Sequence, residues 1–92
     1  MNLIINESFS GRLDSQVDYI AQDSPARARK FKEDLLEKIK SIPLNPYLNR
    51  KSIYFDDDLI RDLIFKGYAI VYKINNDTIE VFGFAKWQES PV

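Results

Sequence analysis

The sequence predicts an α+β fold in which a two-helix hairpin packs on a small antiparallel β-sheet, in the order β-α-α-β-β-β(-β). Two changes of pattern support this. Apolar residues recur at helical spacing between residues 13 and 42, and from residue 59 to residue 84 the pattern changes to the two-residue period of strands. Hairpin-sized turns at residues 66–67 and 75–77 divide the alternating part. The length of 92 residues fits a single domain over residues 1–92.

The chain begins with a short apolar run, Leu3-Ile4-Ile5, which predicts a first strand. Ser8 or Ser10 is placed to cap the helix that follows, because a serine hydroxyl accepts from a backbone N–H of the first turn. One apolar stripe then marks the first helix: Leu13, Val17, Ile20 and Ala21.

A second helix starts directly after a break at residues 22–25. Ser24 suits the cap, and Pro25 suits the first helical position, where no backbone N–H is needed. Pro43 should end this helix, because it disfavours the α conformation at the residue before it. The short link predicts an αα-hairpin. The apolar stripe of this helix is Ala28, Phe31, Leu35, Ile39 and Ile42.

The rest of the chain reads as strands. Residues 51–55 are the weaker prediction, and residues 59–65, 68–74 and 78–84 are the stronger ones. In the middle strand the larger apolar side chains fall on one face, so we expect an antiparallel meander with that face against the helices. The other face, or a groove between helices and sheet, is left for partners.

Composition excludes several classes of function. The chain has no Cys and no His. It therefore lacks disulfides, a thiolate nucleophile, a zinc site and a Ser-His triad. Its three Gly are scattered, which excludes a phosphate-binding glycine loop. We expect no cofactor and no metal.

Charge and hydropathy restrict the partners and the location that we expect for the protein. A net charge of -1 argues against a sequence-blind nucleic-acid binder, which is normally strongly basic. No apolar run reaches the length of a membrane span, and the start lacks the basic and apolar regions of a secretory signal. We expect a cytoplasmic protein with no membrane contact.

Three stretches together carry a family resemblance. They are DYIAQDSP with the Ala28 and Phe31 that follow, the loop IPLNPYLNR, and the strand pair IRDLIFKGYAIVYKI. The same stretches occur in this order in toxins of the RelE/ParE superfamily. The chain resembles the ParE-type branch over roughly residues 14–85.

The resemblance implies the toxin of a type II toxin–antitoxin module. Such a toxin would arrest growth by binding a host target such as DNA gyrase, and a small, partly disordered antitoxin would neutralise it. It would meet DNA only through the antitoxin. A second reading is a RelE-type, ribosome-dependent mRNA endonuclease. A third is an inactive member that only binds its antitoxin, because Ala69 stands where the family carries Arg.

The candidate site residues follow from these readings. Metal-independent RNA cleavage would have only Arg61, Lys66, Tyr68 and Lys86 to place around a phosphate. Binding of the target or antitoxin would fall to Arg61, Lys86 and Trp87, as charged and aromatic anchors. Arg61 has the alternative of pairing with Asp56, Asp58 or Asp62, and Trp87 that of closing the core. Tyr68 and Tyr72 are expected as core aromatics whose hydroxyls reach the surface.

Two clusters of charged residues do not indicate one particular function. Three consecutive carboxylates at residues 56–58 point in alternating directions, so we expect a solvated loop and no cation site. The basic residues at the start of the long helix are either a solvated surface or a patch for an acidic partner. They are Arg27, Arg29, Lys30 and Lys32.

Overall fold

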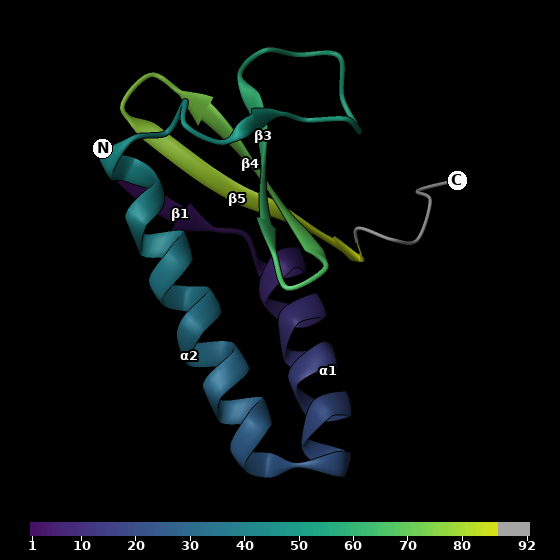
Figure 1. Ribbon diagram of the computed structural model, residues 1–92. Coiled ribbons are helices and arrows are strands. Elements are labelled where there is room, and N and C mark those ends of the chain that lie inside the picture. The colour runs from purple at the N-terminus through teal and green to yellow at the C-terminus, as the bar shows by residue number, and fades with distance from the viewer. Residues whose placement is uncertain (87–92) are drawn as a thin grey trace.

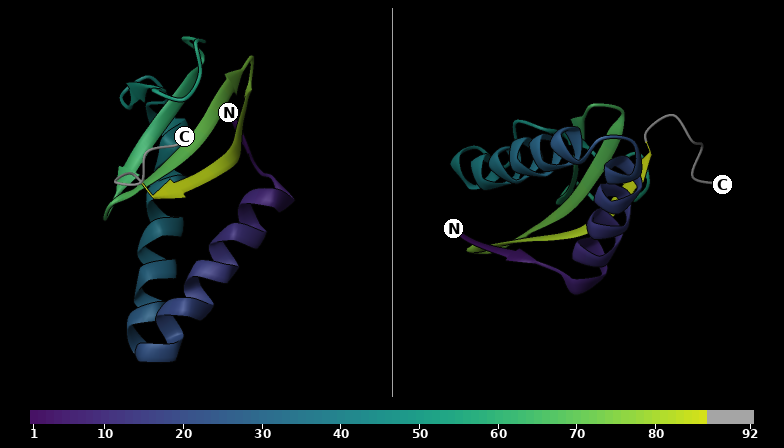
Figure 2. Two further views of the ribbon diagram at one scale, coloured as in Figure 1. Left: turned by 90° about the vertical axis from the view of Figure 1, so that its right-hand side faces the viewer. Right: turned by 90° about the horizontal axis from the view of Figure 1, so that it is seen from below.

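The computed structural model describes residues 1–86, and Figure 1 shows a helix hairpin spreading from its connecting turn toward one sheet. Figure 2 shows the helices projecting past the end of that sheet. Neither helix is long and apolar enough to cross a membrane, as far as the described residues reach. In chain order the elements are β1 (Asn2–Ile5), α1 (Glu7–Asp23), α2 (Pro25–Ser41), a 3₁₀ turn (Ile42–Leu44), β2 (Arg50–Lys51), β3 (Ile60–Phe65), β4 (Tyr68–Asn75) and β5 (Thr78–Lys86).

The five strands form one sheet in the order β1-β5-β4-β3-β2. Strands β2 to β5 are antiparallel neighbours, so the predicted meander is confirmed. Strand β1 lies outside it and pairs with β5 in parallel, Leu3 opposite Ile79. The sheet is therefore mixed rather than antiparallel throughout. Local pattern could not show this, because it does not tell which edge a first strand joins.

Side-chain caps fix both helices. The side chain of Asn6 caps α1 by accepting from the backbone N–H of Ser8 at 2.8 Å, so the expected cap at Ser8 or Ser10 is wrong. The predicted start of α2 is confirmed, with Ser24 accepting from the N–H of Arg27 and Pro25 in the first turn. The α-helix ends at Ser41, and Pro43 lies in the 3₁₀ turn that follows.

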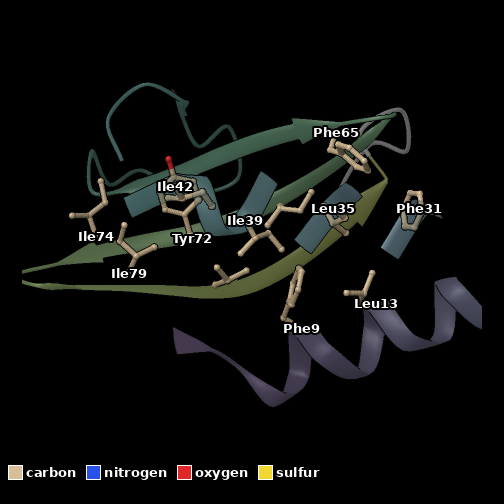
Figure 3. Close-up of a cluster of buried hydrophobic side chains, with 12 residues drawn as sticks. Phe9, Leu13, Phe31, Leu35, Ile39, Ile42, Phe65, Tyr72, Ile74 and Ile79 are labelled. Carbon is tan, nitrogen blue, oxygen red and sulfur yellow. The ribbon is translucent and has the colours of Figure 1, made fainter. Parts of the chain in front are cut away.

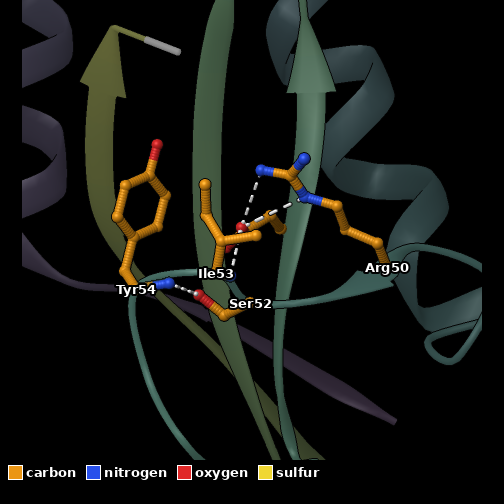
Figure 4. Close-up of polar contacts among 5 residues, drawn as sticks. Arg50, Ser52, Ile53 and Tyr54 are labelled. Atoms are coloured by element: carbon orange, nitrogen blue, oxygen red, sulfur yellow. Dashed lines mark hydrogen bonds and ion pairs between the residues drawn. The ribbon is translucent and has the colours of Figure 1, made fainter. Parts of the chain in front are cut away.

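The predicted strand at residues 51–55 is mostly a loop. Arg50–Lys51 is the only part that forms a strand beside β3, and one backbone bond follows it, from the N–H of Ser52 to Ile60 O at 2.9 Å. Beyond it, side chains replace the ladder: Asp62 accepts from the N–H of Ile53 at 3.1 Å, and Ser52 accepts from the N–H of Tyr54 at 3.1 Å. Figure 4 shows this network.

The main core lies between the helix hairpin and the inner face of the sheet (Figure 3). The middle strand presents the expected alternate residues to it. Burying large aliphatic and aromatic side chains contributes roughly 1.5–3 kcal/mol each. The cluster comprises Phe9, Leu13, Phe31, Leu35, Ile39, Ile42, Phe65, Ile70, Tyr72, Ile74, Ile79 and Val81.

The outer face of the sheet is covered at its centre. Ala69 and Val71 point away from the helices yet are buried. The loop at residues 52–58 lies over this face, with the ring of Phe55 5.6 Å from that of Phe82. An open outer face is therefore wrong for the middle of the sheet.

Candidate functional site

A row of aromatic rings lies where the helix hairpin meets the end of the sheet. The rings of Tyr68 and Phe84 stack, with centroids 5.0 Å apart and planes 11° from parallel. Phe31 from α2 meets Tyr68 edge-on at 5.4 Å, and Phe9 from α1 meets Phe84 edge-on at 5.7 Å. Such contacts add about 0.5–1.5 kcal/mol each beyond burial, so the row forms a firm apolar floor.

Two open hollows meet on this floor at Tyr68, with volumes of about 430 and 450 Å³. We call their combined lining the basic aromatic groove. One hollow lies between the helices and the β3–β4 turn, and the other lies between α1 and the end of β5. The residues that define the groove are Arg12, Gln16, Tyr19, Ile20, Arg27, Lys30, Phe31, Lys66, Tyr68, Phe84 and Lys86.

The groove is positively charged although the chain as a whole carries -1. The carboxylate of Asp34 is shared by two groove cations, with the ammonium of Lys30 at 3.4 Å and that of Lys66 at 3.6 Å. Arg27 pairs with Asp23 at 2.8 Å. Within residues 1–86 the lining of the groove supplies five cations, and Asp23 and Asp34 pair with three of them. These exposed ion pairs stabilise the fold little, which leaves the cations able to exchange partners.

Lys66 occupies this position in an unusual backbone conformation. Its φ is 47°, in the left-handed region, and Gly67 follows at 83°. Two positive φ values are what a tight turn between antiparallel strands requires, and Asn or Gly normally supplies the first. A lysine there carries a backbone cost of about 1 kcal/mol. The turn places the Lys66 ammonium at the groove, 5.3 Å from the centroid of the Phe65 ring.

The structure brings together three of the residues predicted from sequence. Lys66, Tyr68 and Lys86 all line the groove. Trp87 lies outside the described residues. The sequence did not single out Arg12, although its spacing to Gln16 and Tyr19 places the three on one helix face.

Arg61 is separated from this group. It lies opposite Tyr72 on the sheet, whereas the groove begins at the Phe65–Tyr68 pair. Its guanidinium donates to two backbone carbonyls, Asp58 O at 2.9 Å and Asn49 O at 3.2 Å. It also lies over the ring of Tyr47 at 5.1 Å. The alternative pairing of Arg61 with a carboxylate of Asp56, Asp58 or Asp62 is wrong, because its guanidinium binds backbone carbonyls. The Asp58 carboxylate pairs with Lys51, and that of Asp62 pairs with Arg50 at 3.1 Å.

Tyr72 is fully buried, which corrects the expectation that its hydroxyl reaches the surface. The hydroxyl donates to Pro46 O at 2.6 Å and accepts from the Asn49 side chain at 3.1 Å. Burial raises the pKa of Tyr72 above 10.0, and the hydrogen bond from Asn49 opposes that rise only in part. Tyr68 is the aromatic of the pair that is half-buried at the groove.

The acidic run has local roles. Asp57 accepts from the N–H of Leu59 and pairs with Lys73, and Asp58 pairs with Lys51 at 3.2 Å. Within residues 1–86 no group of three or more acidic side chains is placed to hold a metal ion.

The basic residues at the start of α2 were expected to form either a solvated surface or a patch for an acidic partner, and the structure separates them. Arg27 and Lys30 line the groove, as a patch for an acidic partner would require. Lys32 points elsewhere and pairs with Asp14 of α1 at 3.6 Å. Spacing along the helix explains the split, because residues three apart share a face and their neighbours do not.

Fold and groove together define the class: a small α+β protein with a cationic surface hollow floored by aromatic rings. The chain belongs to the ParE toxin family of type II toxin–antitoxin systems, parDE, whose family model matches residues 3–89. Membership in this family implies a cognate antitoxin as partner.

The fold agrees with a solved structure described as a chromosomal ParDE TA system from P. aeruginosa. The two are 20% identical with a TM-score of 0.77, over 94% of this chain and 95% of the other. At that identity the likeness establishes the fold alone. The search of curated proteins found no match to this sequence.

Proposed function

We propose that this chain is a growth-arresting toxin that acts by binding a host target, with DNA gyrase as our candidate. We further propose that its antitoxin neutralises it by occupying the basic aromatic groove. The observation that carries the second part is the contrast between a chain of net charge -1 and a groove with five cations. The first part rests on membership in the ParE family.

The groove favours one kind of partner segment. An apolar floor flanked by cations suits an amphipathic helix with apolar anchors on one face and carboxylates beside them. A disordered, acidic antitoxin tail would supply both on folding. Tyr68 divides the floor, so anchors on either side of its ring would fix the register of the segment.

Binding fits the site better than RNA cleavage does. Metal-independent cleavage needs several cations around one phosphate with an acid beside them. Arg61 holds two loop carbonyls and is not available for this. Ala69, at the position where the family carries Arg, is buried on the outer face, away from Lys66 and Lys86.

Expression of the chain tests the proposal. Induced alone, it should arrest growth, and co-expression of the neighbouring reading frame should restore growth. Purified toxin should inhibit supercoiling by the host's DNA gyrase and leave ribosome-bound mRNA intact. Cleaved mRNA with normal supercoiling would instead establish the endonuclease reading, and harmless expression would establish the inactive one.

Paired variants test the groove. Lys30→Glu with Lys66→Glu should still arrest growth but escape rescue, because two attractive charges become repulsive to an acidic partner. Lys38→Glu with Lys40→Glu makes the same charge change further along α2 and should be rescued like the parent chain. Rescue of both variants would exclude the groove as the antitoxin site.

A further inference from the structure

One carboxylate lies between two cations of the basic aromatic groove. Asp34 follows Lys30 by one turn of α2, and Lys66 reaches it from the β3–β4 turn. The same atom, Oδ2 of Asp34, lies 3.4 Å from the Lys30 ammonium and 3.6 Å from the Lys66 ammonium. Because both lysines line the groove, Asp34 already gives them the kind of group that an acidic partner would bring.

Asp34 also marks where the positive surface along α2 ends. It lines the next hollow, of about 420 Å³, together with Glu37 and Lys38. Within residues 1–86 that hollow is lined by two carboxylates and one ammonium, whereas the lining of the groove supplies five cations. An acidic segment is therefore attracted as far as Asp34 and repelled beyond it.

The contacts of Asp34 are loose enough to be exchanged. Its side chain is 33% exposed, and those of Lys30 and Lys66 are 74% and 55% exposed. Both nitrogen–oxygen distances exceed the separation of about 2.7–2.9 Å that is typical of a strong charge-assisted hydrogen bond. Exposed pairs of this kind contribute little to stability, so an incoming carboxylate can replace Asp34 at the two ammonium groups.

Two opposite effects of the Asp34 carboxylate have to be compared. It would help a partner by holding the lysines in place, and it hinders a partner by competing for them. The backbone already holds the lysines, because Lys30 lies within α2 and the φ values of 47° at Lys66 and 83° at Gly67 fix the turn. The Lys66 ammonium also lies 5.3 Å from the centroid of the Phe65 ring. Competition is therefore the larger effect, since a like charge at the same place repels the carboxylate of the partner.

We infer that Asp34 is an internal competitor of the antitoxin: its carboxylate occupies the place between Lys30 and Lys66 that a carboxylate of the antitoxin segment takes on binding. This rests on the proposed binding of the antitoxin at the groove. The antitoxin has to displace Asp34, so the toxin binds it less tightly than the cations of the groove allow. A segment without a carboxylate at this point cannot replace Asp34, which makes Asp34 a residue that determines specificity.

Asp34→Asn tests this role, because it removes the charge and keeps the size and shape of the side chain. The affinity for the purified antitoxin, the product of the neighbouring reading frame, should rise about three- to tenfold in titration calorimetry at about 0.1 M salt. At about 1 M salt the gain should fall below about twofold, because the Debye length is then only about 3 Å. The melting temperature should stay near that of the parent chain, since the ion pairs are exposed.

Asp14→Asn is the matched control. Asp14 pairs with Lys32 at 3.6 Å, and Lys32 points away from the groove. This variant has the same net charge as Asp34→Asn and should bind the antitoxin like the parent chain. An equal gain in affinity would assign the effect to net charge and overturn the role of Asp34. In a chain that carries Lys30→Gln and Lys66→Gln, Asp34→Asn should change the affinity less than about twofold, because no ammonium remains to compete for.

The remaining outcomes separate Asp34 from the groove. If Lys30→Gln with Lys66→Gln leaves the antitoxin affinity unchanged, the groove is not the antitoxin site, and Asp34 has nothing to compete for. If that variant binds more weakly and Asp34→Asn binds like the parent chain, the groove is the antitoxin site and only the competitor role is wrong. Weaker binding by Asp34→Asn would show instead that its carboxylate holds the lysines in position.

Discussion

Tyr72 shows how one side chain links the core to a surface loop. Its ring packs in the main core, and its hydroxyl is bonded to Pro46 O and Asn49. The alternation of residues in β4 predicted which face the ring would take. The partners of the hydroxyl could not be predicted, because they come from a loop more than twenty residues earlier in the chain.

Replacing Tyr72 by Phe should destabilise the fold by about 1–2 kcal/mol, because Pro46 O and the Asn49 amide lose a buried partner. For a domain of this size that corresponds to roughly 4–8 °C of melting temperature per kcal/mol. Thermal unfolding followed by circular dichroism measures it. Tyr19→Phe removes an exposed hydroxyl and should leave the melting temperature unchanged.

Comparing the parent chain with Tyr72→Phe also tests the raised pKa of Tyr72. Above pH 10.0 the unfolded chain loses the phenolic proton while the folded chain keeps it, so the folded state loses stability as the pH rises. Tyr72→Phe removes this contribution and should show a shallower alkaline decline. Parallel slopes for the two chains would contradict the assigned shift.

The residue at the first position of the turn between β3 and β4 has to fit a left-handed backbone and also lines the groove. Its geometry favours Asn at the first position, whereas the groove receives a cation from Lys66. The second hairpin, between β4 and β5, has Asn76 at a φ of 55° and faces no such conflict. The sequence pattern predicted both turns but not the conflict, because the neighbours of Lys66 come from α2.

Lys66→Asn should raise the free energy of unfolding by about 0.5–1 kcal/mol, because Asn tolerates the left-handed conformation better. It should also weaken antitoxin binding several-fold by removing one groove cation. Chemical denaturation and calorimetric titration measure the two effects. Asn76→Lys is the reverse change at the other hairpin, and it should cost stability without affecting binding.

Local signals predicted most elements and few of their long-range contacts. Ser24 and Pro25 predicted the start of α2, and the strand periodicity predicted β3 to β5. The edge of the sheet that β1 joins depends on its distant partner β5. The loop over the outer face depends on Asp62, which lies in β3. The groove was anticipated in outline, but Arg12, Arg27 and Lys30 become neighbours of Lys66 and Lys86 only after folding.

On the scale of the whole molecule, charge and apolar surface are divided between two ends. The cations of the basic aromatic groove lie at the turn end of the sheet, and the exposed Leu44 and Leu48 lie at the opposite end. Long-range electrostatics should therefore govern antitoxin binding at the groove.

Salt tests the role of charge in antitoxin binding. From about 0.1 M to 1 M salt the Debye length falls from about 10 to 3 Å, so antitoxin affinity should drop at least tenfold. Titration calorimetry at both salt concentrations measures the change. An affinity that does not depend on salt would contradict antitoxin binding through the cations of the groove.

The parallel pairing of β1 with β5 has a consequence for synthesis. Residues 2–5 pair with residues 78–81, so this edge of the sheet cannot form until the chain has been translated past residue 81. Contacts that span so much sequence also form slowly. If the chain is the toxin that we propose, a fragment that ends before residue 78 should be harmless. An antitoxin already present would then have time to bind the chain before its sheet is complete.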